Sequence, residues 1–257
     1  MILALTRPVS ASIAGCELSH LERTPIDVEI ARAEHAAYER ALEEAGCTIR
    51  RLPAADALPD AVFVEDTAIV LDDLAIVTNP GAASRRPETT AIAEALGALR
   101  PLARIAAPGT LDGGDVMRVG RTLHVGTSAR TNADGIAQLR ALVAPYGVQV
   151  RAVPFDGCLH LKSAVTPIAD DLLLVNPEWV EARHFDGMRT LAVDPGEPFA
   201  ANALLVNGRV IHGAHFERTQ ARMRALGIDA VPVPAGELAK AEGGVTCCAL
   251  LVGVGRA

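Results

Sequence analysis

The chain has 257 residues and a formal net charge of −7, and half of its residues are apolar. This composition is typical of a globular protein, and an acidic chain without a basic cluster argues against nucleic acid or an anionic membrane as a partner. No apolar run approaches the roughly 18 residues of a membrane span, and the first residues predict a strand rather than a signal peptide.

Pairs of apolar strands joined by tight turns recur along the chain. Four pairs lie at 66–78, 115–125, 161–175 and 203–212. The fourth pair turns at Asn207-Gly208, which is the strongest short signal for a hairpin. A fifth apolar strand, 248–252, has the opening strand, 2–5, as its natural partner. Pairing of these two ends would close a ring.

Helical patterns separate the hairpins. Apolar residues recur at helical spacing over 26–45, 86–99, 132–146 and 217–226, whereas 176–188 is a poorer helix candidate with Pro177 in its first turn. A short strand follows each helical stretch, as at 48–52, 148–153 and 230–233.

The repeating unit is therefore strand, strand, helix, strand, with a period of roughly 45 residues. Five such ββαβ units predict one α/β domain over residues 1–257, a five-bladed α/β propeller with pseudo-five-fold symmetry. Three strands per unit and hairpin connections do not fit a (β/α)₈ barrel.

The five cysteines do not indicate a disulfide framework. Their number is odd, they are widely spaced, and the chain contains no CxxC pair and no local His/Cys cluster with the spacing of a structural zinc site. We expect reduced thiols and a cytoplasmic protein.

A polar or reactive residue stands immediately before the first strand of each unit. In equivalent units of a ring, these positions point at the same axial pocket, and loops at strand ends are a usual place for chemistry. Each residue alone has a structural interpretation, such as a tight turn, a core histidine or a small buried hydrophobe. Their shared position in the repeat favours one common pocket. The residues are Glu65 with Asp66, Asp112 with Asp115, His160, Asn202 and Cys247.

Six segments, taken together, resemble the dimethylarginine dimethylaminohydrolase family of the guanidine-modifying (pentein) superfamily. The match covers essentially the whole chain, in order and at family spacing. The resemblance implies a five-bladed α/β propeller, which the repeat count indicates independently. The segments are Phe63-Val-Glu-Asp-Thr-Ala, Ser84-Arg-Arg, Leu111-Asp-Gly-Gly-Asp-Val, Arg130-Thr-Asn, Leu159-His-Leu-Lys-Ser and Gly243-Gly-Val-Thr-Cys-Cys.

The resemblance implies hydrolysis of Nω-methylated arginines to citrulline and a methylamine, without a metal or an organic cofactor. Cys247 would attack the guanidinium carbon as a thiolate and form an S-alkylthiouronium intermediate. His160 would protonate the leaving amine and then activate water. Asp112 matches a position between the guanidinium and the histidine.

The resemblance also implies the contacts of a small cationic amino acid. Glu65 and Asp66, with Asp60 behind them, match a carboxylate cage for the guanidinium, which charge-assisted hydrogen bonds can hold. Arg85 and Arg130 match a clamp on the substrate α-carboxylate.

The mouth of the site is also assigned by resemblance. Ser163 and the loop from Leu18 to Arg23 match the region around the amino-acid end of the substrate. In this loop the chain departs from the family spacing, so the lid leucine is either Leu18 or Leu21. We expect a monomer or a homodimer.

The sequence predicts different roles for the two adjacent cysteines, Cys247 and Cys248. Because side chains alternate along a strand, Cys247 and Cys248 are expected to face opposite ways. Cys247 directly follows Gly243-Gly-Val-Thr and takes the nucleophile position of the family.

Three alternative functions use the same residues. An arginine or agmatine deiminase is the nearest, but arginine deiminases carry an additional helical insertion, and agmatine lacks the carboxylate that Arg85 and Arg130 would bind. A zinc-binding module is the alternative from another class, because cysteine, histidine and carboxylates are zinc ligands. The third is a propeller that only binds, although every matched position carries a competent residue.

Overall fold

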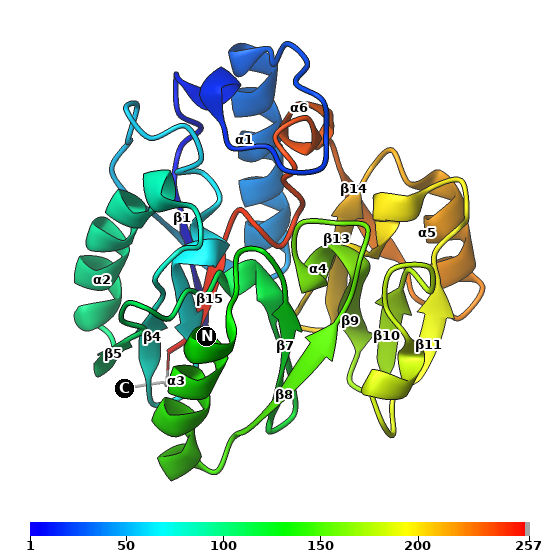
Figure 1. Ribbon diagram of the computed structural model, residues 1–257. Helices are drawn as coiled ribbons and strands as arrows, with labels where there is room; N and C mark the ends of the chain where they lie inside the picture. Colours follow the sequence, from blue (N-terminus) through cyan, green and yellow to red (C-terminus); the bar gives the residue numbers. More distant parts are fainter. Residues whose placement is uncertain (255–257) are drawn as a thin grey trace.

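The computed structural model describes residues 1–254, in which five three-stranded sheets surround a common axis (Figure 1). In every sheet the first two strands pair antiparallel and the third joins them parallel to the second. The predicted five-bladed α/β propeller is confirmed. The sheets are β15 (Leu250–Gly253), β1 (Ile2–Thr6) and β2 (Cys47–Arg51); β3 (Ala68–Val70), β4 (Ala75–Val77) and β5 (Leu102–Arg104); β6 (Val116–Val119), β7 (Thr122–Thr127) and β8 (Gln149–Pro154); β9 (Val165–Ala169), β10 (Leu172–Val175) and β11 (Arg189–Ala192); β12 (Ala203–Val206), β13 (Arg209–Gly213) and β14 (Ala230–Val233).

The ring closes through the two ends of the chain. β1 pairs antiparallel with β15, with Ile2 opposite Gly253 and Leu5 opposite Leu250. One sheet is therefore built from residues about 250 positions apart, as the opening and closing strands predicted.

Helices cross from the second to the third strand on the outside of the ring (Figure 1). A parallel strand pair needs such a crossover, and an amphipathic helix covers the sheet at the same time. In four of the units the crossover contains α1 (Val28–Glu44), α2 (Thr89–Gly97), α3 (Ala133–Val143) or α5 (Glu217–Arg224).

The third unit has no α-helix in this position. Between β10 and β11 the chain forms only a 3₁₀ turn, η6 (Ala182–His184), so the candidate helix at 176–188 is wrong. Trp179 packs edge-on against Phe199, with ring centroids 4.9 Å apart, and an irregular segment holds this side chain against the neighbouring unit. The repeat is thus ββαβ in four units and lacks the helix in one.

Five separate hydrophobic cores stabilise the ring, each between two neighbouring sheets. The core between the closing sheet and the β3–β5 sheet shows the pattern: it joins Leu5 and Val252 to Ala75 of β4 and Leu96 of α2. Along the axis the first strands of the five sheets line a cavity of about 240 Å³. Packing between sheets therefore holds the ring, and the axis stays open.

A short helical turn precedes the first strand in four of the units, and a non-helical turn over residues 245–248 does so in the fifth. Four of the first strands thus begin later than predicted, because the residues before them form these turns, whereas β12 begins at Ala203 as predicted. These helical turns are η2 (Val64–Thr67), η4 (Gly113–Asp115), α4 (Leu161–Ala164) and η7 (Pro198–Ala201); the remaining short helices are η1 (Ile13–Gly15), η3 (Ala83–Glu88), η5 (Ala144–Tyr146) and α6 (Gly236–Ala239).

Over residues 1–254 no helix has the length and apolar character needed to cross a bilayer. Within the same residues all five cysteines are buried free thiols.

Candidate active site

The turns at one end of the axis bring a thiol, an imidazole and carboxylates to one small cavity. Asp66 comes from η2, His160 is the residue before α4, and Cys247 lies in the turn that leads to β15. Asp60 and Arg130 line the same cavity. Its volume is about 20 Å³, little more than one water molecule requires.

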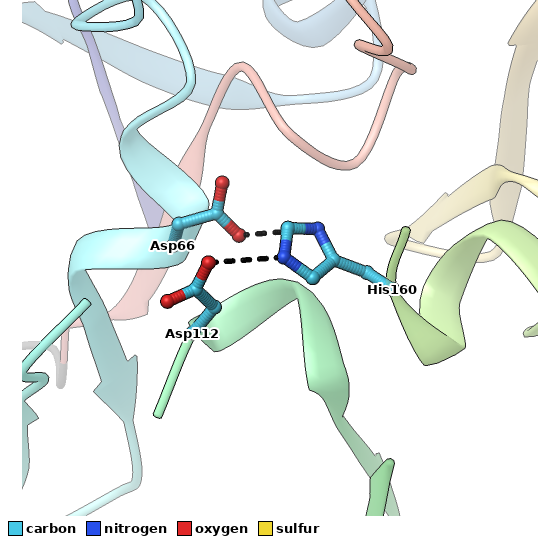
Figure 2. Close-up of side chains that lie close together, drawn as sticks. All are labelled: Asp66, Asp112 and His160. Atoms are coloured by element: carbon cyan, nitrogen blue, oxygen red, sulfur yellow. Dashed lines mark hydrogen bonds and ion pairs between the residues drawn. The ribbon is translucent and has the colours of Figure 1, made fainter. Parts of the chain in front are cut away.

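The imidazole of His160 faces two carboxylates, which lie on the same side of the ring (Figure 2). Its Nε2 is 3.1 Å from Asp112 Oδ2, and its Nδ1 is 3.6 Å from Asp66 Oδ1. All three side chains are buried. Asp112 itself is held by the backbone N–H of Gly81, which donates to its Oδ1.

This arrangement favours a protonated His160. Burial opposes the charge on the ring, but Asp66, Asp112 and Asp115 outweigh it and raise the pKa of His160 to about 9. Burial likewise opposes ionisation of Asp66, yet His160 and Arg85 lower the pKa of that carboxyl to about 2. At neutral pH the site therefore contains an imidazolium, which can act as a proton donor.

The glycines between Asp112 and Asp115 permit this close packing. A Cβ on Gly114 would lie 2.6 Å from His160 Nδ1, and one on Gly113 would lie 2.0 Å from the carbonyl oxygen of Glu65. Asp115 supports the other side of the histidine, because its Oδ1 accepts the N–H of Leu161 at 3.0 Å. The Asp-Gly-Gly-Asp segment is thus a point of close approach between units as well as a turn.

Cys247 lies in a turn that directs a backbone donor at its sulfur. The N–H of Gly244 lies 3.3 Å from Cys247 Sγ. Burial, followed by the charges of Glu65 and Asp66, raises the pKa of the Cys247 thiol to about 12. The free site therefore holds a thiol, and a cation bound in the cavity beside Asp66 would favour the thiolate.

Strand alternation does not separate Cys247 from Cys248, contrary to expectation, because both residues precede β15 and neither is in a strand. What separates them is the geometry of the turn. Both cysteines belong to the core beneath α1, but Cys247 also borders the cavity, whereas the thiol of Cys248 donates to the carbonyl oxygen of Gly244 at 3.7 Å.

Glu65 differs from its expected place in the carboxylate cage. It does not line the cavity that contains Cys247 but borders the axial cavity, where Lys162 Nζ lies 2.5 Å from its Oε1. The hydroxyl of Thr246 donates to its Oε2 at 2.8 Å. Burial raises the pKa of Glu65, and Lys162 opposes that rise. Sequence reasoning missed Lys162, whose only signal was its place two residues after His160.

Arg85 and Arg130 both border the small cavity but are engaged to different degrees. Arg85 is buried and donates to Asp66 Oδ2 at 2.5 Å, to both oxygens of Glu88, and to the carbonyl oxygen of Phe63. Arg130 donates to Ser19 Oγ at 3.1 Å and lies 4.0 Å from Asp112. The contacts of Arg85 thus hold Asp66 in place, and Arg130 has the more available guanidinium.

The segment 17–21 covers the site. Both carboxylate oxygens of Asp60 accept the N–H of Glu17, at 3.3 and 3.1 Å. Glu242 Oε1 accepts the N–H groups of Ser19, His20 and Leu21 at 2.6 to 3.0 Å. These contacts close the cavity to its present size.

A larger cavity of about 260 Å³ adjoins the small one, and Leu159, Glu242 and Gly243 line both. Leu21 and Ser163 border this larger cavity, whereas Leu18 packs against the core beneath α1.

Among residues 1–254, one group of side chains could hold a metal ion. Asp66, Asp112 and His160 each offer a ligand atom, and these atoms lie within 4.8 Å of one another. The donor set fits a metal poorly, because both ring nitrogens of His160 face carboxylates that keep the ring protonated, and a metal needs the neutral imidazole.

Comparisons with known proteins give consistent results. A model of the family described as N,N dimethylarginine dimethylhydrolase, eukaryotic, matches residues 19–185. The N(G),N(G)-dimethylarginine dimethylaminohydrolase of Pseudomonas aeruginosa is 38% identical over 251 residues, with 97% of this chain and 98% of the relative covered. The protein of the same name from Streptomyces coelicolor is 40% identical, with 95% and 94% covered.

Solved structures also share the fold of this chain. A cysteine-to-serine variant of the P. aeruginosa enzyme complexed with citrulline superposes with a TM-score of 0.93 at 35% identity, over 97% of this chain and 98% of that one. A histidine-to-glycine variant of a dimethylarginine dimethylaminohydrolase, as its adduct with S-methyl-L-thiocitrulline, gives a TM-score of 0.91 at 36% identity, with 97% and 98% covered. The N-terminal domain of a cyanobacterial arginine dihydrolase, at 18% identity and a TM-score of 0.86, shares the fold, with 99% of each chain covered.

Proposed function

Because the chain belongs to the dimethylarginine dimethylaminohydrolase family, we propose that it hydrolyses Nω-methylated arginines to citrulline and dimethylamine or methylamine. One observation carries the proposal. Cys247 and His160, from units far apart in the sequence, border one buried cavity together with the carboxylates of Asp60 and Asp66. The thiol is a nucleophile, the imidazolium is an acid, and the carboxylates suit a cation.

Asp60 and Asp66 bind the guanidinium. A guanidinium presents several N–H donors in one plane, and carboxylates accept them in charge-assisted pairs. When the segment 17–21 moves away, Asp60 loses its contact with Glu17 and gains a free carboxylate. Arg130, released from Ser19, binds the α-carboxylate of the substrate, while Arg85 keeps Asp66 oriented.

The first chemical step forms a bond between Cys247 Sγ and the guanidinium carbon. Binding of the cation beside Asp66 lets the thiol lose its proton to water, because it offsets the negative charge that keeps the free sulfur protonated. As the thiolate attacks, the bond from carbon to the methylated nitrogen breaks. That nitrogen takes the proton of His160 and leaves as dimethylamine, and the carbon stays bound to sulfur as an S-alkylthiouronium.

The second step returns the enzyme to its starting state. The neutral His160 takes a proton from a water molecule, and the resulting hydroxide bonds to the same carbon. The bond from carbon to sulfur then breaks as the new hydroxyl group passes its proton to the departing sulfur, which releases citrulline and restores the Cys247 thiol. His160 is again an imidazolium, which Asp112 and Asp66 stabilise in both half-reactions.

A citrulline assay with four substrates tests the proposal. Dimethylarginine, monomethylarginine, arginine and agmatine are supplied separately, and the released amine is identified. We expect citrulline with dimethylamine or methylamine from the methylated substrates, and little ammonia from arginine. Ammonia as the main product from arginine or agmatine would assign the chain to the deiminases instead.

The zinc-binding alternative is tested in the same assay. We expect a metal chelator to leave turnover unchanged or higher, since zinc at the thiol or the imidazole would block the chemistry. Loss of turnover on chelation, restored by added zinc, would support the metal-dependent module.

A further inference from the structure

Asn202 occupies in the fourth unit the position that carries Asp66, Asp112, His160 or Cys247 in the other four, yet the reaction above gives it no role. It follows η7 directly, and only 8% of its surface is exposed. Its side chain makes three hydrogen bonds, two to Thr246, which precedes Cys247, and one to Lys162, two residues after His160.

The three bonds tie the cysteine turn to the histidine turn. Asn202 Oδ1 accepts the N–H of Thr246 at 3.1 Å, and Nδ2 donates to Thr246 Oγ1 at 3.0 Å. The same Nδ2 donates to the carbonyl oxygen of Lys162 at 3.1 Å. Thr246 directly precedes Cys247, and Lys162 lies in α4, which begins directly after His160.

The network leaves only one orientation for the amide. The hydroxyl proton of Thr246 is donated to Glu65 Oε2, so Thr246 Oγ1 must accept from Asn202. The carbonyl oxygen of Lys162 can only accept. Both protons of the amide are therefore used, and a carboxylate at 202 would face two acceptors with no proton to donate.

The amide also packs against the residue that contacts the sulfur. A Cβ on Gly244 would lie 2.4 Å from Asn202 Oδ1, so this glycine lies directly on the amide. The N–H of Gly244 is the group 3.3 Å from Cys247 Sγ, and its carbonyl oxygen accepts the N–H of Cys247 at 3.1 Å. Displacement of the amide would move the donor that stabilises the thiolate.

From this geometry we propose that Asn202 is a positioning residue, which fixes the turn 244–247 against the His160 turn and so holds the Gly244 N–H on the Cys247 sulfur. The proposal rests on the proposed function only in that it names the reacting groups. Asn202 acts through the turn and is not required to touch the substrate. Because it also borders the larger cavity, direct binding of substrate is the competing explanation.

The test compares Asn202→Asp with Asn207→Asp. The control makes the same change at Asn207, which lies in the hairpin turn between β12 and β13. The amide of Asn207 donates to the carbonyl oxygen of Ala45 and takes no part in the site. For both variants kcat and KM with dimethylarginine are measured, together with the melting temperature. The rate of Cys247 alkylation by iodoacetamide, followed by mass spectrometry between pH 7 and 10, reports the thiolate without any substrate.

For Asn202→Asp we expect kcat to fall roughly 10- to 100-fold, with KM changed less than about threefold, and alkylation to slow about tenfold at each pH. Asn207→Asp is expected to change neither quantity by more than about twofold, even if its melting temperature falls. Equal effects from the two variants, an unchanged kcat, or a rise in KM alone would overturn the proposal.

A second pair covers the case in which Asn202→Asp does not fold. Thr246→Val removes the hydroxyl that Asn202 contacts, and Thr246→Ser restores it. We expect slow alkylation in the first and nearly normal alkylation in the second; equal rates would overturn the proposal. If the unaltered protein does not hydrolyse dimethylarginine, the proposed function fails, whereas the alkylation rates still judge the role of Asn202.

Discussion

Cys247 and Cys248 are chemically identical neighbours, and their surroundings alone distinguish them. Cys247 borders the cavity with His160 and accepts the Gly244 N–H, whereas Cys248 does not border that cavity and donates to the Gly244 carbonyl oxygen. A serine at either position keeps nearly the same volume, so the comparison isolates the chemistry of the sulfur.

We expect Cys247→Ser to abolish turnover and Cys248→Ser to keep most of it. The measurement is citrulline release from dimethylarginine by each purified variant, with circular dichroism to show that both are folded. An active Cys247→Ser and an inactive Cys248→Ser would exchange the two assignments.

His160 gives the activity an alkaline limit with a defined sign. Its pKa is raised to about 9, so the proton that the leaving amine needs is present below this value and is lost as the pH rises through it. Replacement of Asp112 by Asn removes one of the negative charges that keep the proton on the ring. The pKa of His160 then falls, and the alkaline limit moves to lower pH.

For Asp112→Asn we expect kcat to fall by roughly 10- to 1,000-fold and the alkaline limb of the kcat profile to shift down by about one pH unit or more. Glu94→Gln, an exposed change on α2, is the control and should leave both unchanged. Similar profiles for the two variants would remove Asp112 from the mechanism.

Glu65 and Arg85 show what residue types alone could not tell. Both were expected to contact the substrate, one as a carboxylate for the guanidinium and one as a cation for the carboxylate. In the structure Lys162 already neutralises Glu65, and Asp66 with Glu88 already neutralises Arg85. Buried charges of opposite sign form ion pairs within the protein, and only the fold shows which side chains pair.

At the scale of elements, the segment 17–21 and the turn at Glu242 act as a pair. Glu242 has a positive φ of 57°, and its carboxylate gathers three backbone N–H groups of the segment. Contacts of this kind between a charge and N–H groups are stronger than neutral hydrogen bonds. They hold closed a cavity that is too small for the substrate, so opening must break them.

We expect Glu242→Gln to raise the amide hydrogen exchange of residues 19–21 by at least about tenfold, because loss of the charge weakens all three contacts. Hydrogen–deuterium exchange followed by mass spectrometry measures this directly. Glu237→Gln in the neighbouring α6, where the carboxylate accepts the N–H of Asp27, is the matched control. Unchanged protection of residues 19–21 in Glu242→Gln would show that other contacts hold the segment.

At the scale of the whole molecule, we expect the stability of the closed ring to depend little on where the chain begins and ends. The N–H of Val254 donates to the carbonyl oxygen of Met1 at 2.9 Å, so the first residue and the last described residue meet at the rim of one sheet. Each of the five cores depends on two neighbouring sheets, and none depends on the order in which the chain visits them. Stability thus requires every sheet but no particular starting point.

A circular permutant tests this view. The old ends are joined by a short flexible linker, and new ends are opened at the exposed turn Asp72-Asp73, between β3 and β4. We expect a folded protein with citrulline production within about tenfold of the original, since exposed turns tolerate new ends. In contrast, truncation before Leu250 removes β15 and should prevent cooperative unfolding in a thermal melt. A folded truncated chain would contradict the requirement for a closed ring.

The repeat itself was determined by local sequence. Alternation of apolar runs, Asn-Gly and Asp-Asp turns and helical spacing are local properties, so five units and their closure could be predicted without coordinates. The polar residue before each first strand followed from the same repeat. The one helix that failed, at 176–188, has Pro177 at its start and a tryptophan whose partner, Phe199, belongs to the next unit.

Only the tertiary structure decided which of the gathered groups border the small cavity and which pair with each other. Pairing of Glu65 with Lys162, of Arg85 with Asp66, and of Asn202 with Thr246 joins residues between 19 and 97 positions apart. The strength of such contacts depends on distance, burial and the number of free donors, none of which is a local property of the chain. The sequence therefore determined that these groups meet, and the packing of the five units determined what each of them contacts.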